Sequence, residues 1–148
     1  IHADTGGRSL EAGVASRSAS YCEEMNNKCK FPSGRSVTIK PRKETEAWLL
    51  ADLDAVGKAL GYTDSLANLG LPSSPNDAEK LVDPKAALTA AVRQVRGRRR
   101  KFNANGLYGA IAQRQSLVHL RKMPSFSEFE LRLARALVEV GCLPSVPK

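Results

Sequence analysis

Apolar residues recur along this chain at helical spacing, in stretches that turn-forming residues separate. In each stretch they lie three or four positions apart, which places them on one side of a helix. The pattern predicts helices over residues 8–29, 44–60, 84–97, 107–120 and 125–140. The second of these reads as one helix or as a broken pair of helices, stopped at Gly61.

Two helix starts carry clear end signals. Asp83-Pro84 combines an N-cap acid with proline at the first helical position, and Gly97 follows as a stop. Ser125-Phe126-Ser127-Glu128 has the spacing of a capping box, and Gly141 closes that helix. Leucine, valine and alanine mark the buried face of the helix over residues 84–97. The buried face of the helix over residues 125–140 is expected to carry Phe129, Leu133, Leu137 and Val140.

Two short segments read as strands instead. Ser36–Lys40 is rich in β-branched residues, and Ile1–Asp4 resembles an apolar strand end followed by an acid and a glycine turn. A helix between two strands implies that the strands are parallel. We therefore expect an α/β fold, with a partial parallel sheet near 1–4 and 36–40 and an α-rich C-terminal region. Residues 1–43 would form the sheet-bearing part and 44–148 the helical part of one domain.

The positive charge of the chain is confined to one segment. The chain carries a net charge of +8, and no acidic residue occurs between Pro84 and Ser127, where ten basic residues fall. Such a localised charge is typical of a surface that binds a polyanion. The alternative is a solvated, arginine-rich helix end. The densest basic residues are candidates for phosphate contacts: Arg93, Arg96, Arg98, Arg99, Arg100 and Lys101.

Carboxylates gather where the second predicted strand turns into a helix. Glu44 and Glu46 lie two residues apart, so on an extended backbone their side chains point to one face. Together with Asp4 they could supply the oxygen ligands that Mg²⁺, or Mn²⁺, prefers. Alternatively, both glutamates stabilise the first helical turn through the helix dipole and pair with Arg42 or Lys43.

Two motifs resemble the signatures of a known family. His2–Ser9 and Glu44–Asp52 are similar to motifs of a bacterial family of unknown function with a TOPRIM-like core, related to overcoming-lysogenization-defect nucleases. Asp83-Pro84-Lys85 and Pro124-Ser125-Phe126 also fit that family's pattern. The resemblance runs from Ile1 to about Leu143 and corresponds to the C-terminal two-thirds of the family's sequence.

The resemblance implies metal-dependent phosphodiester chemistry. By this reading Asp4, Glu44 and Glu46 hold magnesium, Glu44 and Glu46 are catalytic, and His2 and Arg8 are further site residues. Two departures stand against it. The glutamate that such a core takes from its first strand would lie upstream of Ile1, and Gly6 occupies the position of a second aspartate.

The sequence thus favours a nuclease-like subunit, and the resemblance adds foreign-DNA defence beside an ATPase partner. DNA rather than RNA is the expected nucleic acid. The alternative is a non-catalytic nucleic-acid-binding or regulatory module with a degenerate metal site. Because a two-stranded sheet is marginal alone, we also expect an upstream segment or a homo-oligomer. No stretch reaches the ~20 apolar residues of a membrane span, and three cysteines without zinc spacing favour the cytoplasm.

Overall fold

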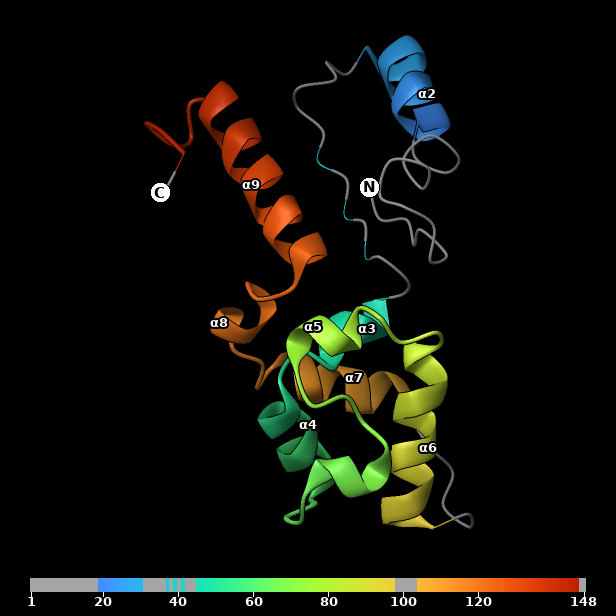
Figure 1. Ribbon diagram of the computed structural model, residues 1–148. Coiled ribbons are helices and arrows are strands. Elements are labelled where there is room, and N and C mark those ends of the chain that lie inside the picture. The colour runs from blue at the N-terminus through green and yellow to red at the C-terminus, as the bar shows by residue number, and fades with distance from the viewer. Residues whose placement is uncertain are drawn as a thin grey trace. The chain divides into compact units, whose positions relative to one another are not determined.

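The computed structural model describes residues 19–30, 37, 39, 41, 45–97 and 104–146, and the elements in this part of the chain are helices (Figure 1). The chain divides into two compact units. One comprises residues 43–123, and the other comprises residues 1–42 and 124–148. The described helices of residues 43–123 are α3 (Thr45–Leu49), α4 (Leu53–Leu60), η3 (Leu66–Leu69), α5 (Pro75–Ala78), α6 (Pro84–Arg96), α7 (Ala104–Ala112) and α8 (Leu117–Leu120).

The expected α/β fold with a parallel sheet is wrong for the described residues, which contain no strand and no sheet. Of the predicted strand 36–40, only Val37 and Ile39 are described, and Ile39 forms no more than an isolated bridge. The predicted strand at residues 1–4 lies outside the described residues. The prediction relied on β-branched residues, whose preference for strands depends on the surface they pack against. Here helices provide the described core.

The segment 44–60 is a broken pair of helices. Asp52 separates α3 from α4 and acts as the N-cap of α4, where its Oδ1 accepts a 3.1 Å hydrogen bond from the amide of Ala55. An N-cap has extended backbone angles, so the helix cannot run through it. Helix α4 ends at Gly61, as predicted, with a φ of 67° that glycine adopts without strain.

The structure confirms the predicted bounds of helix α6. Asp83 is the N-cap and accepts a 2.7 Å hydrogen bond from the amide of Ala86, Pro84 begins the helix, and Gly97 follows its end. Leu88 is fully buried and Val92 nearly so, which confirms the apolar stripe of the sequence. Packing of this face against α3 and η3 fixes α6 within its unit.

The single helix predicted over 107–120 is wrong. Two helices occur instead, α7 and α8, with a turn between them. Ser116 interrupts the helix because its Oγ accepts from the amide of Val118, which makes it the N-cap of α8. A serine in a predicted helix can compete in this way for backbone donors.

A buried apolar core joins the helices of residues 43–123. Helix α7 packs against α3 and α4, and α3 also contacts α5 and α6. The largest apolar side chains that lie fully buried include Leu50, Val56, Leu88, Ile111 and Met123. They come from points spread along the whole unit, so each helix stays in place through contacts with the others.

The second unit contains α2 (Ala19–Cys29) and α9 (Pro124–Glu139) among its described residues. Helix α9 begins one residue before the predicted capping box and ends near Gly141, as expected. Its buried face differs from the prediction, because Leu133 is 36% exposed and Val140 44% exposed, whereas Phe126 is buried.

Candidate functional site

The residues of the predicted metal site fall mostly outside the described part of the chain. The residues outside it are Asp4, Glu44, His2 and Arg8. Glu46 is described: it lies in the first turn of α3 and is half-buried. In that position a carboxylate faces the positive end of the helix, which is the structural alternative that the sequence left open.

Metal ligands do not cluster in the described ranges. Within residues 19–30, 45–97 and 104–146, no group of three or more histidine, cysteine, aspartate or glutamate side chains is placed to hold a metal ion. Cys29 and Cys142 are free and exposed. Of the predicted magnesium ligands, only Glu46 lies among the described residues, and no chemical step through a metal can be derived from their geometry.

Two of the predicted phosphate-binding residues lie on α6. Arg93 and Arg96 fall in its last turn, and both side chains are exposed. Neither forms an ion pair with any residue that the structure describes. The other candidates, Arg98, Arg99, Arg100 and Lys101, directly follow Gly97 in sequence and lie outside the described residues.

The polar face of α6 carries three cations. At ~100° per residue, Lys85, Thr89, Arg93 and Arg96 fall within an arc of ~80° on one side of the helix. The first, third and fourth are exposed, and the hydroxyl of Thr89 donates to the carbonyl of Lys85 at 2.7 Å. The stripe lies beside the buried apolar face and contains no acid. We name these four residues the α6 basic stripe.

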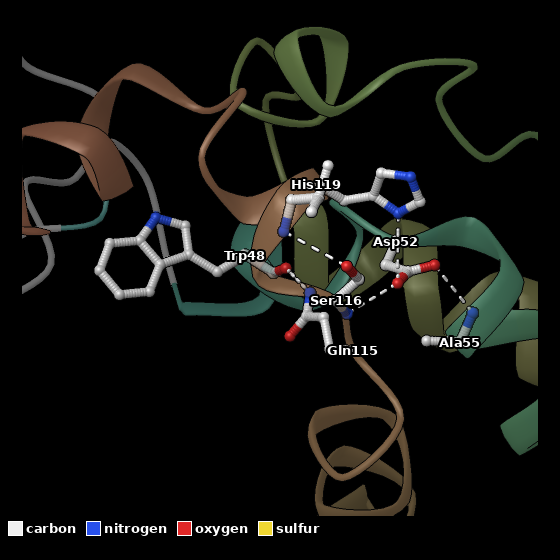
Figure 2. A network of polar contacts seen from close by, with 7 residues as sticks. Trp48, Asp52, Ala55, Gln115, Ser116 and His119 are labelled. Atoms are coloured by element: carbon white, nitrogen blue, oxygen red, sulfur yellow. Dashed lines mark hydrogen bonds and ion pairs between the residues drawn. The ribbon is translucent and has the colours of Figure 1, made fainter. Parts of the chain in front are cut away.

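A polar network surrounds Asp52 in residues 43–123 (Figure 2). The buried carboxylate of Asp52 accepts from the amide of Ala55 with one oxygen, and with the other it accepts from the amide of Ser116 at 2.9 Å. It therefore joins the start of α4 to the turn between α7 and α8.

His119 completes the surroundings of this carboxylate. Its Nδ1 lies 3.2 Å from Oδ2 of Asp52, but the contact lacks the geometry of a hydrogen bond, so charge attraction is its main component when the imidazole is protonated. Burial by itself raises the pKa of Asp52. The hydrogen bonds from the amides of Ser116 and Ala55, together with His119, outweigh burial and hold that pKa below its ordinary value.

A second contact fastens the same turn. The side-chain amide of Gln115 donates to the backbone carbonyl of Trp48, which ends α3 together with Leu49. The indole ring of Trp48 is half-buried and points away from the Asp52 carboxylate (Figure 2). Trp48 thus contributes its carbonyl to the network.

The network holds the backbone in place. An aspartate beside a histidine can orient an imidazole for proton transfer, but that chemistry requires a nucleophile or substrate next to the ring. The Ser116 hydroxyl accepts from the amide of Val118 and caps α8. Its position as N-cap gives it a structural role.

Sequence reasoning missed the network, although part of it left a signal. Asp52 before the apolar run of residues 53–60 is an N-cap pattern, and Ser116 before Leu117 is another. Read together, they predict both helix breaks. The pairing of Asp52 with Ser116 had no local signal, because the two are joined only in the folded chain.

Comparisons with family models, with curated proteins and with solved structures find no match. Among the described residues, no helix has both the length and the apolar character needed to cross a bilayer. The function is therefore inferred from the residues of this chain alone.

Proposed function

We propose that this protein binds nucleic acid through the phosphate backbone, without reading its sequence. The observation that carries the proposal is the α6 basic stripe, whose Arg93 and Arg96 are exposed and have no ion-pair partner among the described residues. Exposed guanidinium groups without acidic partners are suited to bidentate contacts with phosphate oxygens.

The sequence around the stripe supports the same function. Arg98, Arg99, Arg100 and Lys101 follow within five residues of Arg96, and no acid occurs from Pro84 to Ser127. A field of one sign raises the local concentration of a polyanion and speeds its association. Because phosphates are the same at every nucleotide, such contacts position a nucleic acid without selecting a sequence.

A structural role for the same arginines makes a different prediction. Cations in the last turn of a helix interact favourably with its dipole, by about 0.3–1 kcal/mol each. If that were their whole role, replacing them would lower the stability of the protein and leave nucleic-acid binding unchanged. The two roles are therefore separable in one pair of variants.

The test is a binding titration with several labelled duplexes whose sequences are unrelated to one another. A metal chelator is present throughout. Arg93→Ala/Arg96→Ala should weaken binding by at least about fivefold for every duplex, which is about 1 kcal/mol. The matched control is Lys58→Ala/Arg135→Ala, which removes the same charge from exposed positions on α4 and α9. Equal weakening by both variants, or no binding by the wild type, would overturn the proposal.

Metal-dependent cleavage remains a separate prediction. It rests on the resemblance and on Asp4 and Glu44, which lie outside the described residues, so the structure adds nothing in its favour. Incubating the same duplexes with Mg²⁺ or Mn²⁺ tests it directly. Foreign-DNA defence, an ATPase partner and a cytoplasmic location remain part of that prediction.

A further inference from the structure

Lys85 extends the cationic surface of α6 far from its C-terminal end. Its side chain is exposed and forms no ion pair with a residue that the structure describes. A rise of ~1.5 Å per residue places Lys85 about 16 Å from Arg96 along the helix axis. The cations of the α6 basic stripe therefore span nearly the whole helix, whereas the run from Arg98 to Lys101 adds charge only after Gly97 in the sequence.

The backbone that carries these cations is held at its start and along its buried face. Asp83 accepts a 2.7 Å hydrogen bond from the amide of Ala86 as the N-cap, and the face with the fully buried Leu88 packs against α3 and η3. The spacing of the cations along the axis is thus set by the fold. On binding, only side-chain freedom has to be lost.

The cations occupy one flank of the exposed surface of α6. Thr89 lies between Lys85 and Arg93, four residues from each, so the three side chains follow one another along the same side of the helix. The other flank carries Ala90 and Gln94, which are exposed and neutral. Gln94 lies ~140° around the helix from Thr89. A polyanion is therefore attracted to the flank of Thr89 and not to that of Gln94.

We propose that a bound nucleic-acid strand runs along α6, roughly parallel to the helix axis, with its phosphates over Thr89 and with Lys85 as the contact furthest from the C-terminal end. This inference rests on the proposed function and gives the path of the strand on that site. Each strand of a duplex carries one charge per ~3.4 Å of its axis, so about 16 Å of helix faces about five phosphates. The path ends at Lys85, because the exposed carboxylate of Asp83 would repel a further phosphate.

A different path would use only the C-terminal end of α6, where Arg93 and Arg96 adjoin the basic run that follows Gly97. The two paths make opposite predictions for a single added acid. Thr89→Glu places a carboxylate between Lys85 and Arg93, in the proposed path, whereas Gln94→Glu places the same charge nearer to the C-terminal cations but on the neutral flank.

The experiment is a titration of labelled DNA duplexes with the full chain, in chelator. Thr89→Glu should weaken binding at least about fivefold, and Gln94→Glu less than about twofold. Thr89→Gln is the neutral control for loss of the hydroxyl and should retain wild-type affinity. Circular dichroism checks that each variant keeps its helices.

The salt dependence of a second variant tests the far contact independently. Lys85→Ala should flatten the slope of log affinity against log salt by about 0.9 units, the value of one neutralised phosphate. Lys58→Ala removes an exposed lysine from α4 and should leave the slope unchanged.

Each outcome bears on the path of the strand. The proposal is overturned if Gln94→Glu weakens binding as much as Thr89→Glu, or if Lys85→Ala keeps the wild-type slope. In both cases a loss of affinity in Arg93→Ala/Arg96→Ala would leave the proposed function standing without this path. A wild type that binds no duplex would overturn both.

Discussion

The carboxylate of Asp52 accepts a 2.9 Å hydrogen bond from the amide of Ser116, 64 residues further along the chain. The same carboxylate caps α4 through the amide of Ala55. One buried side chain thus satisfies donors from two parts of the unit that the sequence separates widely. The position of α8 depends on this connection.

Replacing Asp52 by alanine is expected to destabilise the protein strongly. The amides of Ala55 and Ser116 would lose their acceptor, and each buried donor left unsatisfied costs about 1–3 kcal/mol. We expect Asp52→Ala to lower the free energy of unfolding by at least about 2 kcal/mol, measured by urea denaturation.

Asp54→Ala is the control for this variant. Asp54 lies in the first turn of the same helix but is exposed, so its loss should cost less than about 1 kcal/mol. Equal losses in the two variants would mean that general helix-dipole effects, and not the buried connection, explain the role of Asp52.

The same carboxylate should contribute to acid sensitivity. Its pKa lies below the ordinary value in the folded protein, so the unfolded chain binds this proton more tightly. The stabilisation is fully present above the ordinary carboxyl pKa, near ~4, and is lost as the pH falls through the lower folded value. The difference in unfolding free energy between wild type and Asp52→Asn should therefore narrow from about pH 6 to about pH 3 in urea titrations. A constant difference would contradict the assignment.

Helix ends were predictable where the local signal was complete. Asp83, Pro84 and Gly97 define both ends of α6, and the structure agrees with each. The absence of a sheet among the described residues was not predictable, because the β-branched run of residues 36–40 reports only a local preference. Strand formation also requires a partner strand, which no local pattern reveals.

In the candidate site, too, local features could be predicted from the sequence, whereas contacts between distant residues could not. The exposure of Arg93 and Arg96 followed from helical periodicity, since they lie beside the buried face of Leu88 and Val92 and not within it. The pairing of Asp52 with Ser116 did not, because a contact between distant residues depends on how the helices pack. The local patterns place both residues at helix starts but do not reveal that they meet.

A variant of Glu46 tests whether this residue binds a metal ion or only stabilises the first turn of α3. It lies in the first turn of α3, so Glu46→Gln should cost on the order of 0.3–1 kcal/mol, with the same loss in Mg²⁺, in Mn²⁺ and in chelator. Calorimetry of wild type and variant under the three conditions measures this. A metal-dependent stabilisation of the wild type that the variant lacks would restore Glu46 as a metal ligand.

The core of residues 43–123 should depend on α6. Leu88 is fully buried, so Leu88→Ala would leave a cavity and should cost about 2–5 kcal/mol in thermal or urea unfolding. Val82→Ala, at a position 87% exposed just before the helix, should change stability by less than about 0.5 kcal/mol. Comparable losses would mean that α6 does not pack as described.

The salt dependence of nucleic-acid binding tests the central claim most directly. For the wild type, log affinity for a duplex should fall linearly with log salt between about 50 and 200 mM, by about 0.9 units for each phosphate neutralised. Arg93→Ala/Arg96→Ala should flatten that slope by about one unit for each phosphate that is no longer neutralised, as should Arg98→Ala/Arg99→Ala/Arg100→Ala, whereas Lys58→Ala should not. Slopes that stay at the wild-type value in both arginine variants would contradict binding through the basic segment.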